Sequence, residues 1–245
     1  KILILAADHL IESQQEFQKA VHKAINLAEN NLLVTFGIKP DSPKTGYGYI
    51  EANGNNVSRF IEKPTLEKAQ QYIQSENFFW NSGMFCFSTD SILRELSIHS
   101  YDIYTTTLET ILKSERKVKN DILLIYLDEN SFENVPSESI DYAVMEKTSQ
   151  IAVIPCDIGW SDIGDWETLG TFDTPDENGN RLRGKTISLE SKNCIVRGNE
   201  RLISLIGVED LIVIDTDDAL LIVKRDQTQK VKDIYSQLDG DNILS

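Results

Sequence analysis

The sequence predicts an α/β protein followed by a smaller strand-rich part, and three observations support this prediction. Apolar runs that are typical of buried strands occur at residues 2–7, 32–37 and 151–155. A helical pattern separates the first two runs, so strand, helix and strand follow one another as in a βαβ unit. After residue 180 the pattern changes to short apolar runs in quick succession.

Residues 2–7 predict the first element, because they form a continuous apolar run that ends at Asp8. Such a run is typical of a central parallel strand buried on both faces. The chain opens at Lys1 directly into this run, so we expect a piece of a longer protein. Ser13 and Glu16 have the spacing of a capping box and predict a helix start, with apolar residues at helical spacing as far as Ala28.

The middle of the chain mixes shorter elements. Two prolines and two glycines make residues 40–48 a turn-rich loop. Pro64 ends the strand that precedes it, since proline cannot donate to a strand ladder. The patterns predict strands at 57–61 and 83–87 and helices at 65–75, 91–96, 105–117 and 139–147.

A polar turn cluster, Asp173 to Asn180, predicts a boundary between domains at 1–172 and 173–245. Beyond it, the apolar runs are separated by Gly, Asp or Asn and predict stacked short strands. A β-helix and a small sandwich both fit this pattern. The predicted strands are 186–189, 194–197, 202–206, 211–214 and 220–223, and a helix at 227–238 closes the chain.

Composition and charge exclude several classes of protein. The 245 residues include 24 Lys and Arg against 39 Asp and Glu, which gives a formal net charge of −15. Nucleic acids and anionic membranes need clustered cations, so neither is expected as a partner. No apolar run reaches the ~20 residues that span a bilayer. Three scattered cysteines form no CxxC pair, which argues against a disulfide framework or a zinc site. We therefore expect a soluble cytoplasmic protein.

Asp8 is the first residue that could carry chemistry. Ligands of parallel α/β sheets bind beyond the carboxyl ends of the strands, where Asp8 is expected. A carboxylate there suits Mg²⁺, which takes oxygen ligands and keeps some waters and phosphate oxygens. A lone Asp that caps a strand-to-helix loop is the simpler alternative.

A second acidic candidate lies in the segment from Gly159 to Trp166, which follows a predicted buried strand and includes Asp162. Glycines allow a ligand to approach the backbone closely. Tryptophan offers a flat face to a sugar. A structural turn held by Trp160 and Trp166 explains the same residues equally well.

Three further segments suit a sugar phosphate. Glu62 is able to accept hydrogen bonds from sugar hydroxyls, and the adjacent Lys63 is a point charge suited to phosphate. Gly46, Tyr47 and Gly48 combine flexible backbone with an aromatic ring, and Asn81 adds an amide before a predicted strand. Each of these signals is weak alone. The sequence has no Gly-x-Ser-x-Gly, Walker A or Gly-x-Gly-x-x-Gly pattern, so serine hydrolases, P-loop NTPases and ordinary dinucleotide enzymes lack support.

The order of these segments is more specific than any one of them. Leu-Ala-Ala-Asp-His at 5–9, Thr-Gly-Tyr-Gly-Tyr-Ile at 45–50, Phe-Ile-Glu-Lys-Pro at 60–64, Trp-Asn-Ser-Gly-Met-Phe at 80–85, Ser-Ile-Asp-Tyr-Ala-Val-Met-Glu-Lys at 139–147 and Gly-Trp-Ser-Asp-Ile-Gly at 159–164 occur in this order. The set resembles the successive motifs of bacterial mannose-1-phosphate guanylyltransferases, and the resemblance covers nearly the whole chain.

The resemblance implies an enzyme that joins GTP and mannose 1-phosphate into GDP-mannose and pyrophosphate with Mg²⁺. It implies a Rossmann-like nucleotidyltransferase domain, then a strand-rich domain that is a left-handed β-helix in many relatives, and a homodimer. Its implied roles for individual residues are as follows: Asp8 and Asp162 hold the metal, Glu62 and Asn81 bind the sugar with the Gly46–Gly48 loop and its Tyr47, and Lys63 binds the sugar phosphate. Asp141 lies in a matching motif without a defined role. The family usually has a small residue where this chain has Asp165.

The family also has a glycine-rich loop, a lysine motif and much of the guanine pocket upstream of the position matched by Asp8. These motifs are absent from the sequence, so we expect the 245-residue chain alone to lack turnover. A non-catalytic sugar-phosphate-binding or assembly subunit is an alternative from another class. A nucleotidyltransferase for another sugar 1-phosphate is the nearest alternative among enzymes.

Overall fold

The computed structural model describes residues 1–164 and 166–238. The chain divides into two compact units, Lys1–Trp160 and Ser161–Ser245, and each unit is described by itself. Among the described residues, no helix is long and apolar enough to cross a membrane.

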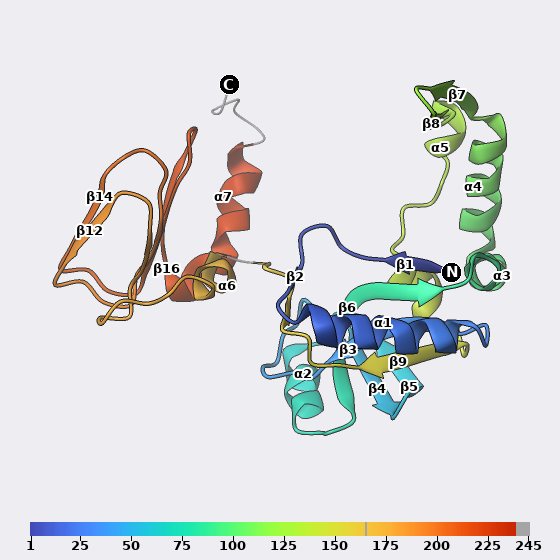
Figure 1. The fold of residues 1–245 in the computed structure, drawn as a ribbon, viewed down its shortest axis with the longest axis horizontal. Coiled ribbons are helices and arrows are strands. Elements are labelled where there is room, and N and C mark those ends of the chain that lie inside the picture. The colour runs from blue at the N-terminus through green and yellow to red at the C-terminus, as the bar shows by residue number, and fades with distance from the viewer. Residues whose placement is uncertain (165, 239–245) are drawn as a thin grey trace. The chain divides into compact units, whose positions relative to one another are not determined.

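The first unit is built on a six-stranded mixed sheet (Figure 1). β3 runs parallel to β9 and antiparallel to β6, and β6 in turn runs antiparallel to β1. β6 curves enough to pair with β4 as well. In spatial order the strands are β1 (Ile2–Ile4), β6 (Phe78–Phe87), β3 (Leu33–Ile38), β9 (Ile151–Pro155), β5 (Asn56–Ile61) and β4 (Tyr49–Asn53).

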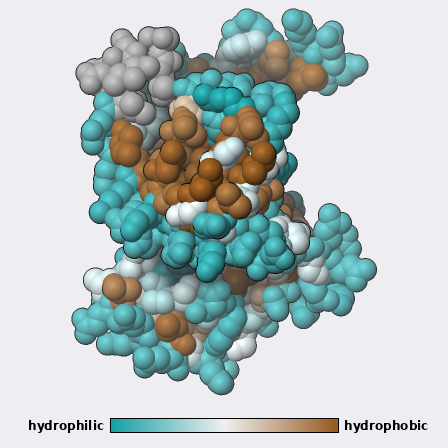
Figure 2. Space-filling view, turned by 90° about the vertical axis from the view of Figure 1, so that its left-hand side faces the viewer, coloured by the Kyte–Doolittle hydropathy of each residue, from teal (hydrophilic) through white to brown (hydrophobic). Residues whose placement is uncertain are grey.

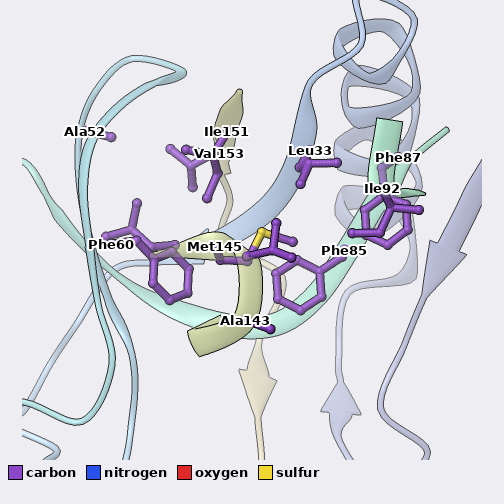
Figure 3. Packing of buried hydrophobic residues seen from close by; sticks show 12 residues of the cluster. Leu33, Ala52, Phe60, Phe85, Phe87, Ile92, Ala143, Met145, Ile151 and Val153 are labelled. Carbon is purple, nitrogen blue, oxygen red and sulfur yellow. The ribbon is translucent and has the colours of Figure 1, made fainter. Parts of the chain in front are cut away.

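Alternation along the strands sends side chains to both faces of this sheet. Val34 and Phe36 of β3 pack with the helix α1 (Gln14–Ala28), while Leu33 belongs to the opposite face. The cluster on that opposite face includes residues of α3 (Thr89–His99) and of the π-helical segment η1 (Asp141–Met145). Figure 3 shows this cluster, in which Met145 lies among Phe60, Phe85 and other side chains of the sheet. η1 is thereby held against the sheet.

The helix predicted from Ser13 is confirmed. The Ser13 side chain accepts a hydrogen bond from the Glu16 backbone N–H at 3.4 Å, which satisfies one free donor of the first turn. Ala20, Ala24 and Ala28 recur every fourth residue and are buried against the sheet. Such small side chains let the helix approach the sheet closely.

The prediction for residues 2–7 is wrong in three respects. β1 covers only Ile2–Ile4, it pairs antiparallel with β6, and it lies at one end of the strand order. Its three side chains are 37–41% exposed. The physical reason is that an apolar run predicts a strand but does not specify what covers it. Within the described residues, α1 packs over β3, β6 and β9, and β1 belongs to none of the three core clusters of this unit.

The other predicted strands and helices of this unit are present: β9 has its predicted bounds of 151–155, and the rest have shifted ends. The strand predicted at 83–87 begins earlier, at Phe78, and the helix predicted at 65–75 is α2 (Leu66–Ile73). β4 was not predicted. It follows the loop at 40–48 and pairs with both β5 and β6. Two short strands, β2 (Leu10–Ile11) and β10 (Trp160–Ser161), pair with each other.

An arm extends from the sheet after α3 (Figure 1). It consists of α4 (Tyr101–Lys113), the hairpin of β7 (Glu115–Lys119) and β8 (Ile122–Tyr126), and α5 (Glu129–Phe132), which packs against α4. A helix was predicted through residue 117, but α4 ends at Lys113. The hairpin was therefore missed.

The second unit confirms the stacked short strands. Ile195 faces Ile212 and Thr186 faces Ile203 in parallel pairs, with the same sequence offset in both. One turn of chain therefore lies on the previous one, as in a β-helix. The strands are β11 (Arg181–Arg183), β12 (Thr186–Leu189), β13 (Ile195–Arg197), β14 (Ile203–Ile206), β15 (Leu211–Asp215) and the antiparallel β16 (Leu220–Lys224).

Helices complete this unit. The structure has α6 (Trp166–Thr171) before the strands. The helix predicted at 227–238 is a 3₁₀ segment η2 (Arg225–Lys230) followed by α7 (Val231–Leu238). Apolar side chains gather on one face of the unit in Figure 2, and Ile187, Leu189 and Ile206 of β12 and β14 are among its exposed hydrophobic residues.

Candidate functional site

The residues predicted to bind a sugar phosphate meet at one end of the first sheet. β4 and β5 are antiparallel and Tyr49 pairs with Ile61, so Gly48, just before β4, lies beside Glu62, just after β5. β6 joins them, because the Asn81 backbone N–H donates to the Gly48 carbonyl at 2.8 Å. Strand register therefore assembles this part of the site from three segments that are far apart in sequence.

Glu62 is the central charged group of this assembly. Its side chain is only 10% exposed, and Oε2 is buried without a hydrogen-bond partner among the described residues. Burial and the Asp141 carboxylate raise the pKa of the Glu62 carboxyl to about 6, although the Lys63 ammonium opposes the shift. A buried acceptor without a donor is costly. A ligand hydroxyl that donates to this carboxylate removes that cost.

Gly48 provides the space that Glu62 needs. A Cβ built on Gly48 would collide with Glu62 Oε2 and would approach the Asn81 Cβ to 3.2 Å. The equivalent Cβ on Gly46 would meet nothing within 4 Å. Of the two predicted glycines, Gly48 is therefore the one whose missing side chain the geometry requires.

Asn81 is fixed by a network of hydrogen bonds. Its Oδ1 accepts from the Thr35 hydroxyl at 2.8 Å and from the Gly83 backbone N–H at 3.2 Å. Its Nδ2 donates to Asp141 Oδ1 at 3.0 Å. Asp141, which had no defined role in the prediction, thus orients the amide of Asn81, and it also adds negative charge beside Glu62.

Lys63 follows Glu62 with an unusual backbone. Its φ is +47°, a left-handed conformation that is rare for a residue with a side chain and more so before a proline. Its Nζ lies 3.7 Å from Glu62 Oε1, and its side chain is 59% exposed. The ammonium therefore faces solvent while it stays next to the buried carboxylate.

Aromatic rings connect the Asp8 segment to this site. Trp160 Nε1 donates to His9 Nδ1 at 3.2 Å, and the ring of Trp160 lies edge-on to Tyr47 at a centroid distance of 5.6 Å. Tyr47 in turn contacts Trp80, the neighbour of Asn81, at 5.1 Å. Asp8, which is exposed, is therefore adjacent in sequence to a residue of the same aromatic cluster.

Asp162 belongs to the second unit, so its predicted convergence with Asp8 on a shared cation stays a prediction. Within its own unit, Asp162 Oδ1 accepts from the Gly164 backbone N–H at 3.2 Å. A Cβ on Gly164 would approach Asp162 Oδ2 to 2.8 Å, so the glycine leaves room for the carboxylate. Ile163 between them has a φ of +47°.

Trp166 and Gly164 line a cavity of about 580 Å³ in the second unit. Leu169, Val231 and Tyr235 form other parts of its wall, and Lys232 adds a positive charge. The tryptophans of the predicted motif thus have different surroundings. Trp160 belongs to the aromatic cluster beside the candidate site, whereas Trp166 packs against Ile195, Ile212 and Ile214 on the strands of its own unit.

The described residues contain no group of three or more His, Cys, Asp or Glu side chains placed to hold a metal ion. A cage made only of protein ligands is therefore absent from the described part of the chain. Mg²⁺ commonly binds through one or two carboxylates together with substrate phosphates. Asp8 and Asp162 have the donor chemistry for that kind of site.

Two residues of the site were not predicted. Thr35 is a fully buried polar residue on β3, and its hydroxyl holds Asn81. The signal was a threonine within an otherwise apolar strand. Glu146 Oε1 accepts from the Glu62 backbone N–H at 2.8 Å and so fixes the turn after β5. It lies inside the motif at 139–147, from which only Asp141 is among the predicted site residues.

The class of the protein follows from an α/β sheet with this candidate site at one end and from a separate β-helix-like unit. The chain belongs to the nucleotidyl transferase family, whose model matches residues 1–176. Residues 184–238 match the mannose-phosphate isomerase/GMP-like β-helix domain.

Individual relatives make the resemblance more specific. The alginate biosynthesis protein AlgA of Pseudomonas aeruginosa is 42% identical over 98% of this chain and 50% of its own length. A mannose-1-phosphate guanylyltransferase of Escherichia coli is 40% identical over 97% of this chain and 53% of its own. The xanthan biosynthesis protein XanB of Xanthomonas campestris is 43% identical over 97% of this chain and 50% of its own length. The chain thus spans about half the length of these relatives.

A solved structure agrees with the fold. A protein of Thermus thermophilus, described as a mannose-1-phosphate geranyltransferase, matches 97% of this chain and 69% of its own with a TM-score of 0.82 and 25% identity. The fold class and the family predicted from the ordered motifs are confirmed.

Proposed function

We propose that the protein forms GDP-mannose and pyrophosphate from GTP and mannose 1-phosphate. A phosphate oxygen of the sugar attacks the α-phosphorus of GTP in line, a new P–O bond forms, and the bond to the leaving pyrophosphate breaks. Positioning and charge neutralisation dominate such transfers, so no covalent enzyme intermediate is needed. The observation that carries this proposal is the buried Glu62 carboxylate, with its unpartnered oxygen, inside a site made of the family's motifs.

The sugar occupies the end of the sheet in this proposal. Glu62 accepts hydrogen bonds from mannose hydroxyls, which supply the donors that its surroundings lack. Asn81, held by Thr35 and Asp141, is a positioned amide for further hydroxyls. The backbone of residues 46–48 and the Tyr47 ring close the site over the sugar.

Lys63 binds the phosphate of the acceptor. Its ammonium lies next to Glu62 and faces solvent, so a sugar bound at Glu62 brings its phosphate within reach. In a chain of net charge −15, a local cation is needed to attract an anionic substrate. The same cation orients the attacking oxygen.

Asp8 and Asp162 are the residues that we propose to hold Mg²⁺. When bound, the ion neutralises the developing negative charge on the phosphates. Two arguments support the pair: His9, next to Asp8, bonds to Trp160, and Asp162 follows Trp160 by two residues, which span at most about 7 Å of chain. The carboxylates bind and orient the ion, and Lys63 orients the acceptor.

The test is pyrophosphate release by the full-length protein with GTP, Mg²⁺ and mannose 1-phosphate. We expect Glu62→Gln to raise the KM for mannose 1-phosphate by roughly 10- to 100-fold, since a hydrogen bond to a charged group contributes about 1.5–3 kcal/mol. The KM for GTP stays within about twofold. Glu67→Gln on the exposed side of α2 is the matched control and leaves both constants unchanged.

Other outcomes contradict parts of this proposal. An unchanged KM for mannose 1-phosphate in Glu62→Gln removes Glu62 from the sugar site. If kcat/KM is higher with glucose 1-phosphate or another sugar 1-phosphate than with mannose 1-phosphate, the proposed sugar is wrong and the proposed type of reaction stands. Binding of mannose 1-phosphate without pyrophosphate release favours the non-catalytic alternative.

A further inference from the structure

The π-helical segment η1 carries two carboxylates that reach the candidate site. Its winding is defined by the Glu146 backbone N–H, which donates to the Asp141 carbonyl five residues earlier at 3.0 Å. In an α-helix, residues five apart would point about 140° away from each other. The wider π turn places them nearly one above the other. Asp141 and Glu146 therefore lie on the same side of η1.

Each of these carboxylates holds a different part of the candidate site. Asp141 Oδ1 accepts from Asn81 Nδ2 at 3.0 Å. Glu146 Oε1 accepts from the Glu62 backbone N–H at 2.8 Å. The segment between them is itself fixed, because residues 143–145 are buried in the core cluster of Figure 3. A rigid element thus supports both groups that are suited to a sugar.

Asp141 decides which atom of the Asn81 amide can meet a ligand. The amide oxygen already accepts from the Thr35 hydroxyl and from the Gly83 backbone N–H. The ionised Asp141 carboxylate can only accept, so the amide nitrogen must face it. Asp141 takes one of the two N–H groups of Nδ2, and among the described residues the second has no acceptor. Asn81 therefore offers a donor to a ligand.

This donor lies close to the unpartnered acceptor of Glu62. A Cβ on Gly48 would lie 3.6 Å from Asn81 Nδ2 and would collide with Glu62 Oε2. The amide nitrogen and the buried carboxylate oxygen therefore border the same small space. A donor and an acceptor side by side match a sugar ring, whose hydroxyls are able both to accept and to donate.

We propose that Asp141 is a positioning residue of the sugar site, which holds the Asn81 amide so that Nδ2 donates to one oxygen of the sugar while Glu62 accepts from a hydroxyl. This inference rests on the proposed function, because the sugar 1-phosphate is the ligand that supplies both groups. Asp141 acts through Asn81. The site thereby selects a sugar with one oxygen that accepts and one hydroxyl that donates at these positions.

Substitution of Asp141 in the full-length protein tests this role. We expect Asp141→Ala to lower kcat/KM for mannose 1-phosphate at least tenfold, because the amide of Asn81 loses its charged partner. The KM for GTP stays within about twofold. Asp141→Asn keeps an oxygen acceptor for Nδ2 and should retain kcat/KM within about threefold of wild type. Glu138→Gln removes an exposed carboxylate just before η1 and is the matched control.

Folding is controlled separately from activity. Circular dichroism verifies that each variant is folded, and Asp141→Leu, which is similar in size to wild type, repeats the measurement without leaving an empty space. We expect Asp141→Leu to lose as much kcat/KM as Asp141→Ala.

Deoxy analogues of mannose 1-phosphate distinguish positioning from a general structural role. The hydroxyl whose removal no longer lowers kcat/KM in Asn81→Ala is the partner of Asn81, as in a double-mutant cycle. We expect the loss at that hydroxyl to fall below about twofold in Asp141→Ala as well, while the loss at the hydroxyl sensed by Glu62→Gln persists. Fluorine accepts a hydrogen bond but cannot donate one, so at the Asn81 position it should lower kcat/KM less than hydrogen does.

The possible failures are distinguishable. If Asp141→Ala leaves kcat/KM unchanged, if the Ala and Asn variants lose equally, or if all deoxy positions change together, this inference is overturned and the proposed function stands. If wild type releases no pyrophosphate from GTP and mannose 1-phosphate, the proposed function is wrong and this inference is wrong with it.

Discussion

At the scale of one residue, Glu62, which we propose to bind the sugar, shows how a group suited to binding can oppose folding. Its carboxyl has a pKa of about 6 in the folded chain against 4.5 for a free glutamate side chain, mainly because burial disfavours the charged form. The folded state therefore binds a proton more tightly than the unfolded state between these two values. By linkage, the free energy of unfolding falls as the pH rises from about 4.5 to about 6.

This linkage gives a prediction on stability. Glu62→Gln removes the charged form, so we expect the variant to equal wild type near pH 4 and to be more stable by up to about 2 kcal/mol at pH 7. Urea unfolding of both proteins across this pH range measures the difference. Glu67→Gln should show no such trend. A variant that is less stable than wild type at pH 7 would show that the Glu62 carboxylate stabilises the fold.

The residues of the site were predictable in type but not in arrangement. Glu62, Asn81 and Gly48 were selected because their chemistry suits a sugar, and the structure brings them together through the register of β4, β5 and β6. Thr35 was missed because its role depends on Asn81, which is far away in sequence and reaches it only in the folded sheet. The sequence pattern alone does not show that Thr35 and Asn81 are hydrogen-bonded.

At the scale of elements, the sequence predicts the features that depend on neighbouring residues alone, such as where a helix starts or which residues form a strand. The cap at Ser13 and the alanines of α1 specify a helix with one buried side, and β12 matches its predicted range of 186–189. The position of β1 in the sheet depends on which elements pack over it, and the local sequence does not show this. The sequence pattern does not predict the β7–β8 hairpin, because charges interrupt β7 and the Asn-Asp turn lacks the glycine of the usual hairpin signals.

Asn180 connects neighbouring turns of the β-helix-like unit. It is fully buried, its Nδ2 donates to the Ser191 carbonyl at 2.9 Å, and its Oδ1 accepts from the Cys194 backbone N–H at 3.0 Å. It also bonds to Asp176. These contacts satisfy backbone groups that would otherwise be buried without partners.

We therefore expect Asn180→Ala to lower the free energy of unfolding by about 2–4 kcal/mol, because it leaves a buried donor and a buried acceptor unsatisfied. Thermal or urea unfolding measures the loss. Asn178→Ala is the matched control in the same turn, since its exposed side chain is not part of this network. The control should change stability by less than about 0.5 kcal/mol. Equal effects of the two substitutions would contradict the structural role of Asn180.

At the scale of the whole molecule, the proposed reaction raises the question of how an acidic protein would bind two anionic substrates. The formal charge of −15 repels phosphates at long range, so attraction must come from a few local cations. We propose that Lys63 is one such cation and that the Mg²⁺ held by Asp8 and Asp162 is another. The two carboxylates belong to different units of the chain, so the proposal that they share one ion needs a test of its own.

Mutation of both carboxylates tests this joint site. If Asp8 and Asp162 hold one ion, removing either should raise the Mg²⁺ concentration for half-maximal pyrophosphate release and lower kcat by orders of magnitude. The double variant Asp8→Asn with Asp162→Asn should then lose little more than either single variant, because effects at a shared ion are strongly non-additive. Mg²⁺ titrations of the full-length protein give both constants, and the exposed Asp157→Asn is the matched control. Two additive losses would mean that the carboxylates act at separate places, and the proposal of a single shared cation would then be wrong.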